Sequence, residues 1–125
     1  MNLPLNIGVV GCGYWGPNLI RNFESLSDSS VKMICDVDEK RLGHLKNLYP
    51  SVETTTNIDH LTQHPDIDAI VIATPVHTHY QFALQALQNG KHVFIEKPMT
   101  SSVAQAVHLN RVANGLGLKL FVGHT

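Results

Sequence analysis

Three glycines at fixed spacing carry the clearest chemical signal in this sequence. The segment Gly11-Cys12-Gly13-Tyr14-Trp15-Gly16 matches G-x-G-x-x-G, a pattern that indicates dinucleotide binding where a strand precedes it and a helix follows. Gly11 permits a tight turn, Gly13 lets the backbone approach a pyrophosphate, and Gly16 lets the helix pack close to the strand. The first amides of that helix then offer hydrogen bonds and partial positive charge to phosphate oxygens. The alternative is a glycine-rich turn that binds no ligand.

An acidic residue follows at the spacing expected for the same kind of site. Asp36 lies 20 residues beyond Gly16, at the end of a predicted strand, where a carboxylate accepts hydrogen bonds from an adenosine ribose. A 2′-phosphate would meet like charge there, so the sequence favours NAD over NADP. Arg41, one helical turn further on, is placed to reach the same end of the cofactor and weakens that preference. Alternatively Asp36 is a helix N-cap, a role that Asp38 fits equally.

Polar residues also follow a long apolar run at 69–73. Thr74 and Pro75 come directly after it, and we expect Thr74 to face the cofactor cleft, because parallel sheets bind ligands beyond the carboxyl ends of their strands. His77 and His79 come next, at the start of a helix. Two residues apart on a helix, they point to different sides, which argues against a metal pair. His79 is either a cleft residue or an ordinary histidine of the first turn.

A second charged pair ends the next apolar run. Glu96 and Lys97 follow residues 92–95 and precede Pro98. A lysine at the carboxyl end of a strand, beside a bound nicotinamide, is placed to protonate or polarise a carbonyl oxygen. On composition alone, a solvated lysine explains Lys97 as well.

Alternating strands and helices must position these residues. We expect strands at 6–10, 31–35, 69–73, 92–95 and 118–122, with a short one within 51–56. Helical spacing of apolar residues predicts helices around Leu19, Phe23 and Leu26; Leu42, Leu45 and Leu48; residues 58–63; Tyr80, Ala83, Leu84 and Leu87; and, from Ser101 on, Val103, Ala106 and Val107. This order predicts an α/β fold: a Rossmann-type, doubly wound parallel sheet of about six strands with helices on both faces.

Composition narrows the function classes. The chain has 125 residues, nine Lys and Arg against ten Asp and Glu, a net charge of −1 and 43% hydrophobic residues. Its scattered cations argue against a nucleic-acid partner, and no apolar run approaches the roughly 20 residues of a membrane helix. Residues 1–6 do not resemble a signal peptide. Cys12 and Cys35 fit no metal-ligand spacing, so we expect no metal and two reduced thiols in a cytoplasmic protein.

The motifs together resemble the N-terminal domain of the Gfo/Idh/MocA oxidoreductases. The resemblance is carried by residues 7–16, by Ala73-Thr74-Pro75 with His79, and by residues 90–98. It implies that Lys97 lies at the nicotinamide of NAD and takes part in catalysis, next to a Lys97–Pro98 bond that is often cis in relatives. Val76 departs from the family, because many members carry Asn there. The predicted cofactor-binding residues are Gly11, Gly13, Tyr14, Trp15, Gly16, Asp36, Arg41, Thr74, Pro75, His79, Glu96 and Lys97.

The resemblance extends to a branch and to the domain organisation. Residues 14–19 and 74–80 look most similar to the UDP-N-acetylglucosamine-type sugar 3-dehydrogenases. Family members add a second domain after residues 123–125, with most sugar contacts and the oligomer interface. We therefore expect residues 1–125 to be the cofactor domain, inactive alone, of a homo-oligomeric sugar or nucleotide-sugar dehydrogenase. The alternative is a non-catalytic NAD-binding or partner-docking module.

Overall fold

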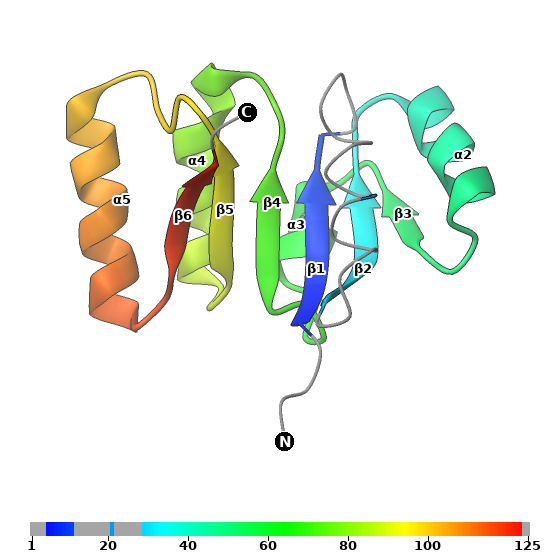
Figure 1. Ribbon diagram of the computed structural model, residues 1–125, viewed down its shortest axis with the longest axis horizontal. Helices are drawn as coiled ribbons and strands as arrows, with labels where there is room; N and C mark the ends of the chain where they lie inside the picture. The colour runs from blue at the N-terminus through cyan, green and yellow to red at the C-terminus, as the bar shows by residue number, and fades with distance from the viewer. Residues whose placement is uncertain (1–4, 12–20, 22–28, 124–125) are drawn as a thin grey trace.

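The computed structural model describes residues 5–11, 21 and 29–123, which form a six-stranded sheet (Figure 1). Its strands are β1 (Leu5–Val10), β2 (Ser29–Cys35), β3 (Glu53–Thr55), β4 (Ala69–Ile72), β5 (His92–Glu96) and β6 (Leu120–Gly123). Its described helices are α2 (Glu39–Leu48), α3 (Ile58–Thr62), α4 (Val76–Gln88) and α5 (Val103–Leu116). The strands are all parallel, in the order β3-β2-β1-β4-β5-β6. This doubly wound order confirms the predicted fold class.

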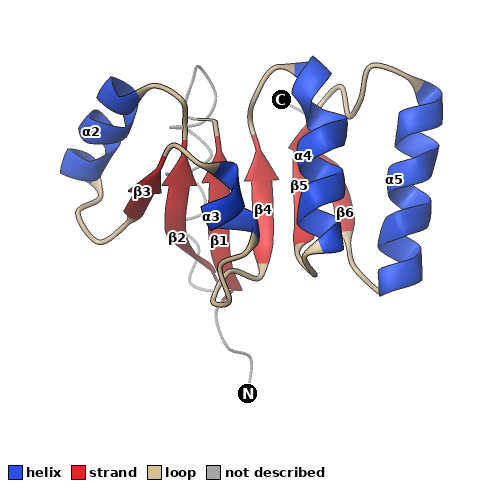
Figure 2. Cartoon of the chain, turned by 180° about the vertical axis from the view of Figure 1, so that it is seen from behind, coloured by secondary structure: helices blue, strands red, loops and turns tan. Residues whose placement is uncertain are grey.

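Helices cover both faces of the sheet, and each face has its own core. Figure 2 shows α3 and α4 in front of the strands, where Leu61 and Leu87 pack with Ile72 of β4. On the opposite face, Leu45 of α2 packs with Val9 of β1. Because both faces are covered, the middle strands are apolar along most of their length, as the run at 69–73 predicted.

The last helix turns a different face to the core from the one that the sequence indicated. Val103 is 80% exposed and Val107 is 49% exposed, whereas Leu109 and Ala113 are buried. The face marked by Val103, Ala106 and Val107 is therefore not the buried one, although Ala106 itself is half-buried. The helix also begins two residues later than Ser101, because the Ser102 hydroxyl caps it by accepting a hydrogen bond from the Gln105 amide.

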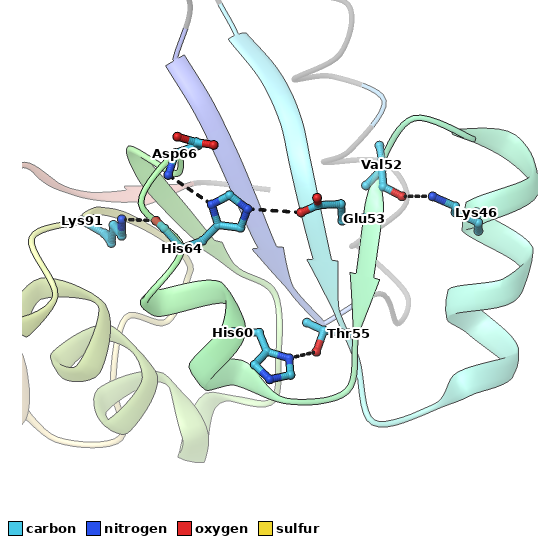
Figure 3. A network of polar contacts seen from close by, with 8 residues as sticks. All are labelled: Lys46, Val52, Glu53, Thr55, His60, His64, Asp66 and Lys91. Carbon is cyan, nitrogen blue, oxygen red and sulfur yellow. Dashed lines mark hydrogen bonds and ion pairs between the residues drawn. The ribbon is translucent and has the colours of Figure 1, made fainter.

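A buried lysine braces the end of the sheet where the strands begin. Lys91 is 7% exposed, and its ammonium donates hydrogen bonds to the carbonyls of His64 (2.6 Å) and Ile67 (2.7 Å). The His64 ring accepts the Asp66 amide at Nδ1 and faces the Glu53 carboxylate with Nε2 (3.2 Å), as Figure 3 shows. Burial lowers the pKa of Lys91, although Asp68 and then Asp66 oppose that shift. The bends around His64 are thus tied to both β3 and β5.

Replacing Lys91 with methionine is expected to lower the free energy of unfolding by about 2–4 kcal/mol, because the Ile67 carbonyl loses its donor and the His64 carbonyl keeps only the Ile67 amide. Lys46→Met is the matched control: Lys46 is exposed and donates to one carbonyl, that of Val52 (Figure 3), so its loss is expected to stay below about 1 kcal/mol. Urea unfolding measures both. Equal losses would contradict a bracing role for Lys91.

Candidate functional site

Gly11 directly follows β1, and its backbone lies against the end of β4. Gly11 has φ +92°, a conformation that L residues rarely adopt. A Cβ at Gly11 would lie 2.8 Å from the Ala73 carbonyl oxygen and 2.8 Å from Thr74 Cγ2. Position 11 therefore has room for glycine alone, as the sequence predicted, whereas the turn expected to follow it lies outside the described residues. The remaining motif residues assigned to the cofactor lie outside the described part of the chain: Gly13, Tyr14, Trp15 and Gly16.

A buried carboxylate lies at the end of the neighbouring strand. Asp36 is 6% exposed, and its Oδ1 accepts a hydrogen bond from the Asp38 amide (2.8 Å). Asp38 is the N-cap of α2, since its Oδ1 accepts the amides of Lys40 (2.9 Å) and Arg41 (3.4 Å). The alternative interpretation of Asp36 as the helix cap is therefore wrong.

Arg41 lies between these two carboxylates. Its guanidinium is 3.9 Å from Asp36 Oδ2 and 3.6 Å from Asp38 Oδ2, and its side chain is 55% exposed. The two carboxylates hold a positive charge at the mouth of the site. Among the described residues of the cleft that these side chains line, Arg41 alone carries a positive charge that would favour the 2′-phosphate of NADP. The Asp36 carboxylate opposes that preference.

A cleft of about 570 Å³ opens at the carboxyl ends of β1, β2 and β4, the edge to which the arrows of Figure 1 point. Five of the predicted cofactor residues line it: Gly11, Asp36, Arg41, Thr74 and Pro75. Apolar side chains complete its described walls, among them Val37, Ile58 and Phe82. The sequence pattern did not single out these three. Val37 is exposed and the other two are half-buried, and no sequence signal marks them as cleft residues before the strand order is known.

Thr74 and Pro75 shape the start of α4. The Thr78 hydroxyl donates to the Pro75 carbonyl (2.6 Å), and the Thr74 and Thr78 hydroxyls are 2.6 Å apart. Pro75 is the N-cap of α4 and offers no side-chain hydrogen bond to it. The first amides of α4 are therefore left uncapped by a side chain next to the cleft.

The other predicted residues gather around the end of β5 rather than in the lining of this cleft. Glu96 is the last residue of β5 and 6% exposed. Neither of its carboxylate oxygens has a hydrogen-bond partner among the residues that the structure describes. A buried carboxylate without donors is costly, so Glu96 marks a place where a ligand with hydroxyl or amide donors fits.

Lys97 follows Glu96 and is exposed. Its amide donates to the Gly123 carbonyl (3.1 Å), which ties it to the end of β6, and the Lys97–Pro98 bond is cis. Gly123 has no space for a side chain, because its Cβ would lie 2.5 Å from the Phe94 ring. The backbone of Lys97 is thus held between two strand ends while its ammonium faces solvent.

His79 lies between the cleft residue Thr74 and the loop that follows Lys97, and it is 2% exposed. Its Nε2 is 2.7 Å from the Thr74 carbonyl oxygen, and its Nδ1 is 3.0 Å from that of Pro98 and 3.2 Å from that of Met99. The ring is therefore occupied by backbone carbonyls on both sides. A direct contact of His79 with a cofactor stays a prediction, as do the other assignments of cofactor contacts.

Cys35 also lines the cleft, a position that the sequence did not indicate. Burial, and secondarily the charge of Asp36, raises the pKa of its thiol from 9.0 to about 11. Because the pKa is higher in the folded chain than in the unfolded one, the stability that the neutral thiol contributes is complete below pH 9 and is lost as the pH rises through about 11.

Iodoacetamide is expected to alkylate Cys35 of a Cys12→Ser variant, which leaves Cys35 as the single thiol, about 100-fold more slowly at pH 8 than an unperturbed cysteine, since the thiolate is the nucleophile. The denatured variant is the control and reacts at the ordinary rate. Mass spectrometry over time measures both rates. Rapid alkylation of the folded variant at pH 8 would contradict the burial of this thiol.

No group of three or more His, Cys, Asp or Glu side chains in residues 5–11, 21 and 29–123 is arranged to hold a metal ion. Within the same ranges, every helix is too short or too polar to cross a membrane.

Comparison with known proteins gives a consistent match along the chain. The family GFO_IDH_MocA, described as an oxidoreductase family with an NAD-binding Rossmann fold, matches residues 5–124. The chain is 34% identical to the uncharacterized oxidoreductase YdgJ of Escherichia coli K12, over 96% of this chain and 34% of that protein. It is 30% identical to the scyllo-inositol 2-dehydrogenase (NADP(+)) IolW of Bacillus subtilis 168, over 96% of this chain and 32% of that protein. The chain thus spans about a third of the length of these relatives.

Solved structures agree with the fold and differ in cofactor. GenD2 from gentamicin A biosynthesis, in complex with NAD, superposes with a TM-score of 0.92 at 27% identity, over 97% of this chain and 34% of that one. KijD10, a 3-ketoreductase of Actinomadura kijaniata in complex with NADP, superposes with a TM-score of 0.90 at 28% identity, over 96% of this chain and 37% of that one. Relatives with this fold therefore bind either dinucleotide.

Proposed function

Since the chain belongs to the Gfo/Idh/MocA oxidoreductase family, whose NAD-binding Rossmann domain it forms, we propose that the full-length protein transfers a hydride between the hydroxyl carbon of a sugar or nucleotide-sugar and the nicotinamide of NAD. The observation that carries this proposal is the cleft at the carboxyl ends of β1, β2 and β4. There, a glycine turn without room for a Cβ faces a buried aspartate.

The residues present fit a dinucleotide. The Gly11 turn lets backbone come close to a diphosphate, and the Asp36 carboxylate is suited to accept ribose hydroxyls. The apolar side chains of Val37 and Ile58 on the cleft walls suit an adenine ring. The Glu96 carboxylate, which has no hydrogen-bond partner in the described part of the chain, is suited to accept donors from the nicotinamide half. When bound, the nicotinamide supplies or accepts the hydride.

Lys97 is the residue that we assign to proton transfer. Its ammonium is a donor, and its neutral amine an acceptor, for the proton of the sugar hydroxyl that becomes a carbonyl. The hydrogen bond from the Lys97 amide to the Gly123 carbonyl fixes the position of the Lys97 backbone. The side chain is exposed, so its amine is accessible to a substrate. Family resemblance supports this role for Lys97 in the Glu96-Lys97-Pro98 motif.

The experiment that tests the function is an assay of the full-length protein with NAD. Candidate substrates are inositols, hexoses and UDP- or TDP-linked sugars, and the absorbance of the reduced nicotinamide is followed. We expect turnover with at least one sugar or nucleotide-sugar. Oxidation of the 3-hydroxyl of a UDP-N-acetylglucosamine-type sugar would place the protein in the branch that its sequence most resembles. Tight NAD binding without turnover on any of these would favour the non-catalytic module instead.

Asp36→Asn is expected to raise the ratio of NADPH to NADH affinity about tenfold, because it removes the charge that repels a 2′-phosphate while Arg41 remains. Asp38→Asn is the matched control. It removes a carboxylate that also contacts Arg41, and asparagine caps a helix equally well, so the ratio is expected to change less than about threefold. Isothermal titration measures the six affinities, those of wild type and both variants for each cofactor. Wild-type protein that binds NADPH more tightly than NADH would overturn the assignment of NAD.

A further inference from the structure

The buried ring of His79 joins two segments that are far apart in the sequence. It projects from the first turns of α4 and touches the carbonyl of Thr74 at the end of β4 on one side. On the other side it touches the carbonyls of Pro98 and Met99, 19 and 20 residues away. These two carbonyls follow Lys97 directly, so the ring holds the loop that carries Lys97 against the neighbouring strand end.

The three contacts of the ring are hydrogen bonds only where the ring nitrogen carries a proton. A carbonyl oxygen only accepts hydrogen bonds, so each ring nitrogen must carry a proton to bond there. The neutral ring donates from one nitrogen and the protonated ring from both. Since the ring of His79 is 2% exposed, water does not replace these bonds when the ring is lost.

The side chain of Lys97 depends on this support. Within the described ranges of the chain, its ammonium has neither a hydrogen bond nor an ion pair, so no side-chain contact there fixes its direction. Its backbone has one anchor before the loop, the Gly123 carbonyl. His79 supplies the anchor after it, together with the packing of the half-buried Met99 against the core.

We propose that His79 is a positioning residue, which donates hydrogen bonds from its ring to the loop after Lys97 and so fixes the lysine over the substrate position. This proposal rests on the role assigned to Lys97 above. It gives His79 a task on the protein backbone in place of a contact with the cofactor.

The test uses three variants of the full-length protein. His79→Phe keeps a planar ring and removes the ring nitrogens and with them any N–H donor, and His79→Gln retains an N–H donor. His44→Phe is the matched control on an exposed position of α2. Hydrogen exchange of the peptide that covers residues 96–102 reports on the loop, and kcat and the KM for NAD report on catalysis.

We expect His79→Phe to speed exchange of this peptide about tenfold and to lower kcat about tenfold, with the KM for NAD within about threefold of wild type. His79→Gln is expected to recover both exchange and kcat to within about threefold, and His44→Phe to leave both unchanged. Unchanged exchange in His79→Phe overturns the proposal. So does a lower kcat with unchanged exchange, since the ring would then act on the reacting groups directly.

Failure of the proposed function looks different from failure of this inference. If the wild-type protein turns over no sugar, the exchange of residues 96–102 still measures the effect of His79 on the loop. If His79→Phe does not fold, nitrogen NMR of the wild-type protein decides the matter. A solvent-protected proton on Nδ1 of His79 supports the proposal, and an Nδ1 without a proton overturns it.

Discussion

If the full-length protein has the activity proposed above, Lys97→Ala is expected to lower its kcat by about 10²–10⁴-fold, the range that a positioned acid or base contributes. The Kd for NADH is expected to stay within about threefold of wild type. The reason is positional: the cleft that we assign to the adenosine half is lined by residues of other loops, and the Lys97 side chain is exposed rather than packed into the fold. Steady-state kinetics and NADH titration by fluorescence measure the two quantities.

Lys119→Ala is the control for this experiment. Lys119 is also exposed, but it precedes β6, at the amino end of the strands, whereas Lys97 follows the carboxyl end of β5. We expect its kcat to match wild type within about twofold. Normal turnover of the Lys97→Ala protein would show that Lys97 takes no part in proton transfer. It would favour the alternative of a non-catalytic NAD-binding module.

Gly11→Ala is expected to raise the Kd for NADH about 100-fold, the equivalent of about 2.7 kcal/mol. The alanine would have to keep φ near +92° and accept contacts of 2.8 Å with a backbone carbonyl and with Thr74. Strain of this kind costs about 1–3 kcal/mol, and overpacking costs a similar amount. To relieve this strain, the backbone at residue 11 has to move away from β4. That backbone is the surface that we assign to the diphosphate.

Gly43→Ala is the matched control for Gly11. Gly43 lies inside α2 with no atom within 4 Å of its added Cβ, and alanine is the better helix former by about 1 kcal/mol. We expect the control to be slightly more stable than wild type and to bind NADH equally well. Thermal unfolding and NADH titration check both variants. Unchanged NADH affinity in Gly11→Ala would show that the turn does not face the diphosphate.

The sequence was most informative where backbone geometry and residue type are linked locally. Gly11 could be predicted because a turn with positive φ admits glycine almost alone. The apolar run of β4 was predictable because a strand covered on both faces has no polar side. Asp36 followed from its spacing after the glycines, and the cleft that it shares with Gly11 is consistent with that prediction.

The features that the sequence did not reveal depend on contacts between distant segments. The ammonium of Lys91 is buried against the carbonyls of His64 and Ile67, which lie 27 and 24 positions earlier in the sequence. The local sequence around Lys91, next to Gly90, does not indicate this contact. The register of β1 against β2 shifts between Ile7 and Gly8. Val31 and Met33 therefore face opposite cores, although their spacing of two indicates the same side.

The same limit applies to α5 and to His79. Apolar spacing marks several stripes on α5, and packing against α4 and β5 selects the one with Leu109 and Ala113. For His79, no local pattern indicates that both ring nitrogens meet backbone carbonyls. That arrangement requires the ends of β4 and β5 to be neighbours.

A crystal structure of the full-length protein with NAD tests the central claim most directly. We predict the diphosphate against the Gly11 turn and the adenosine ribose hydroxyls within hydrogen-bond distance of Asp36. A dinucleotide bound elsewhere, or an Asp36 carboxylate that contacts no ribose while NAD is present, would contradict the proposed site.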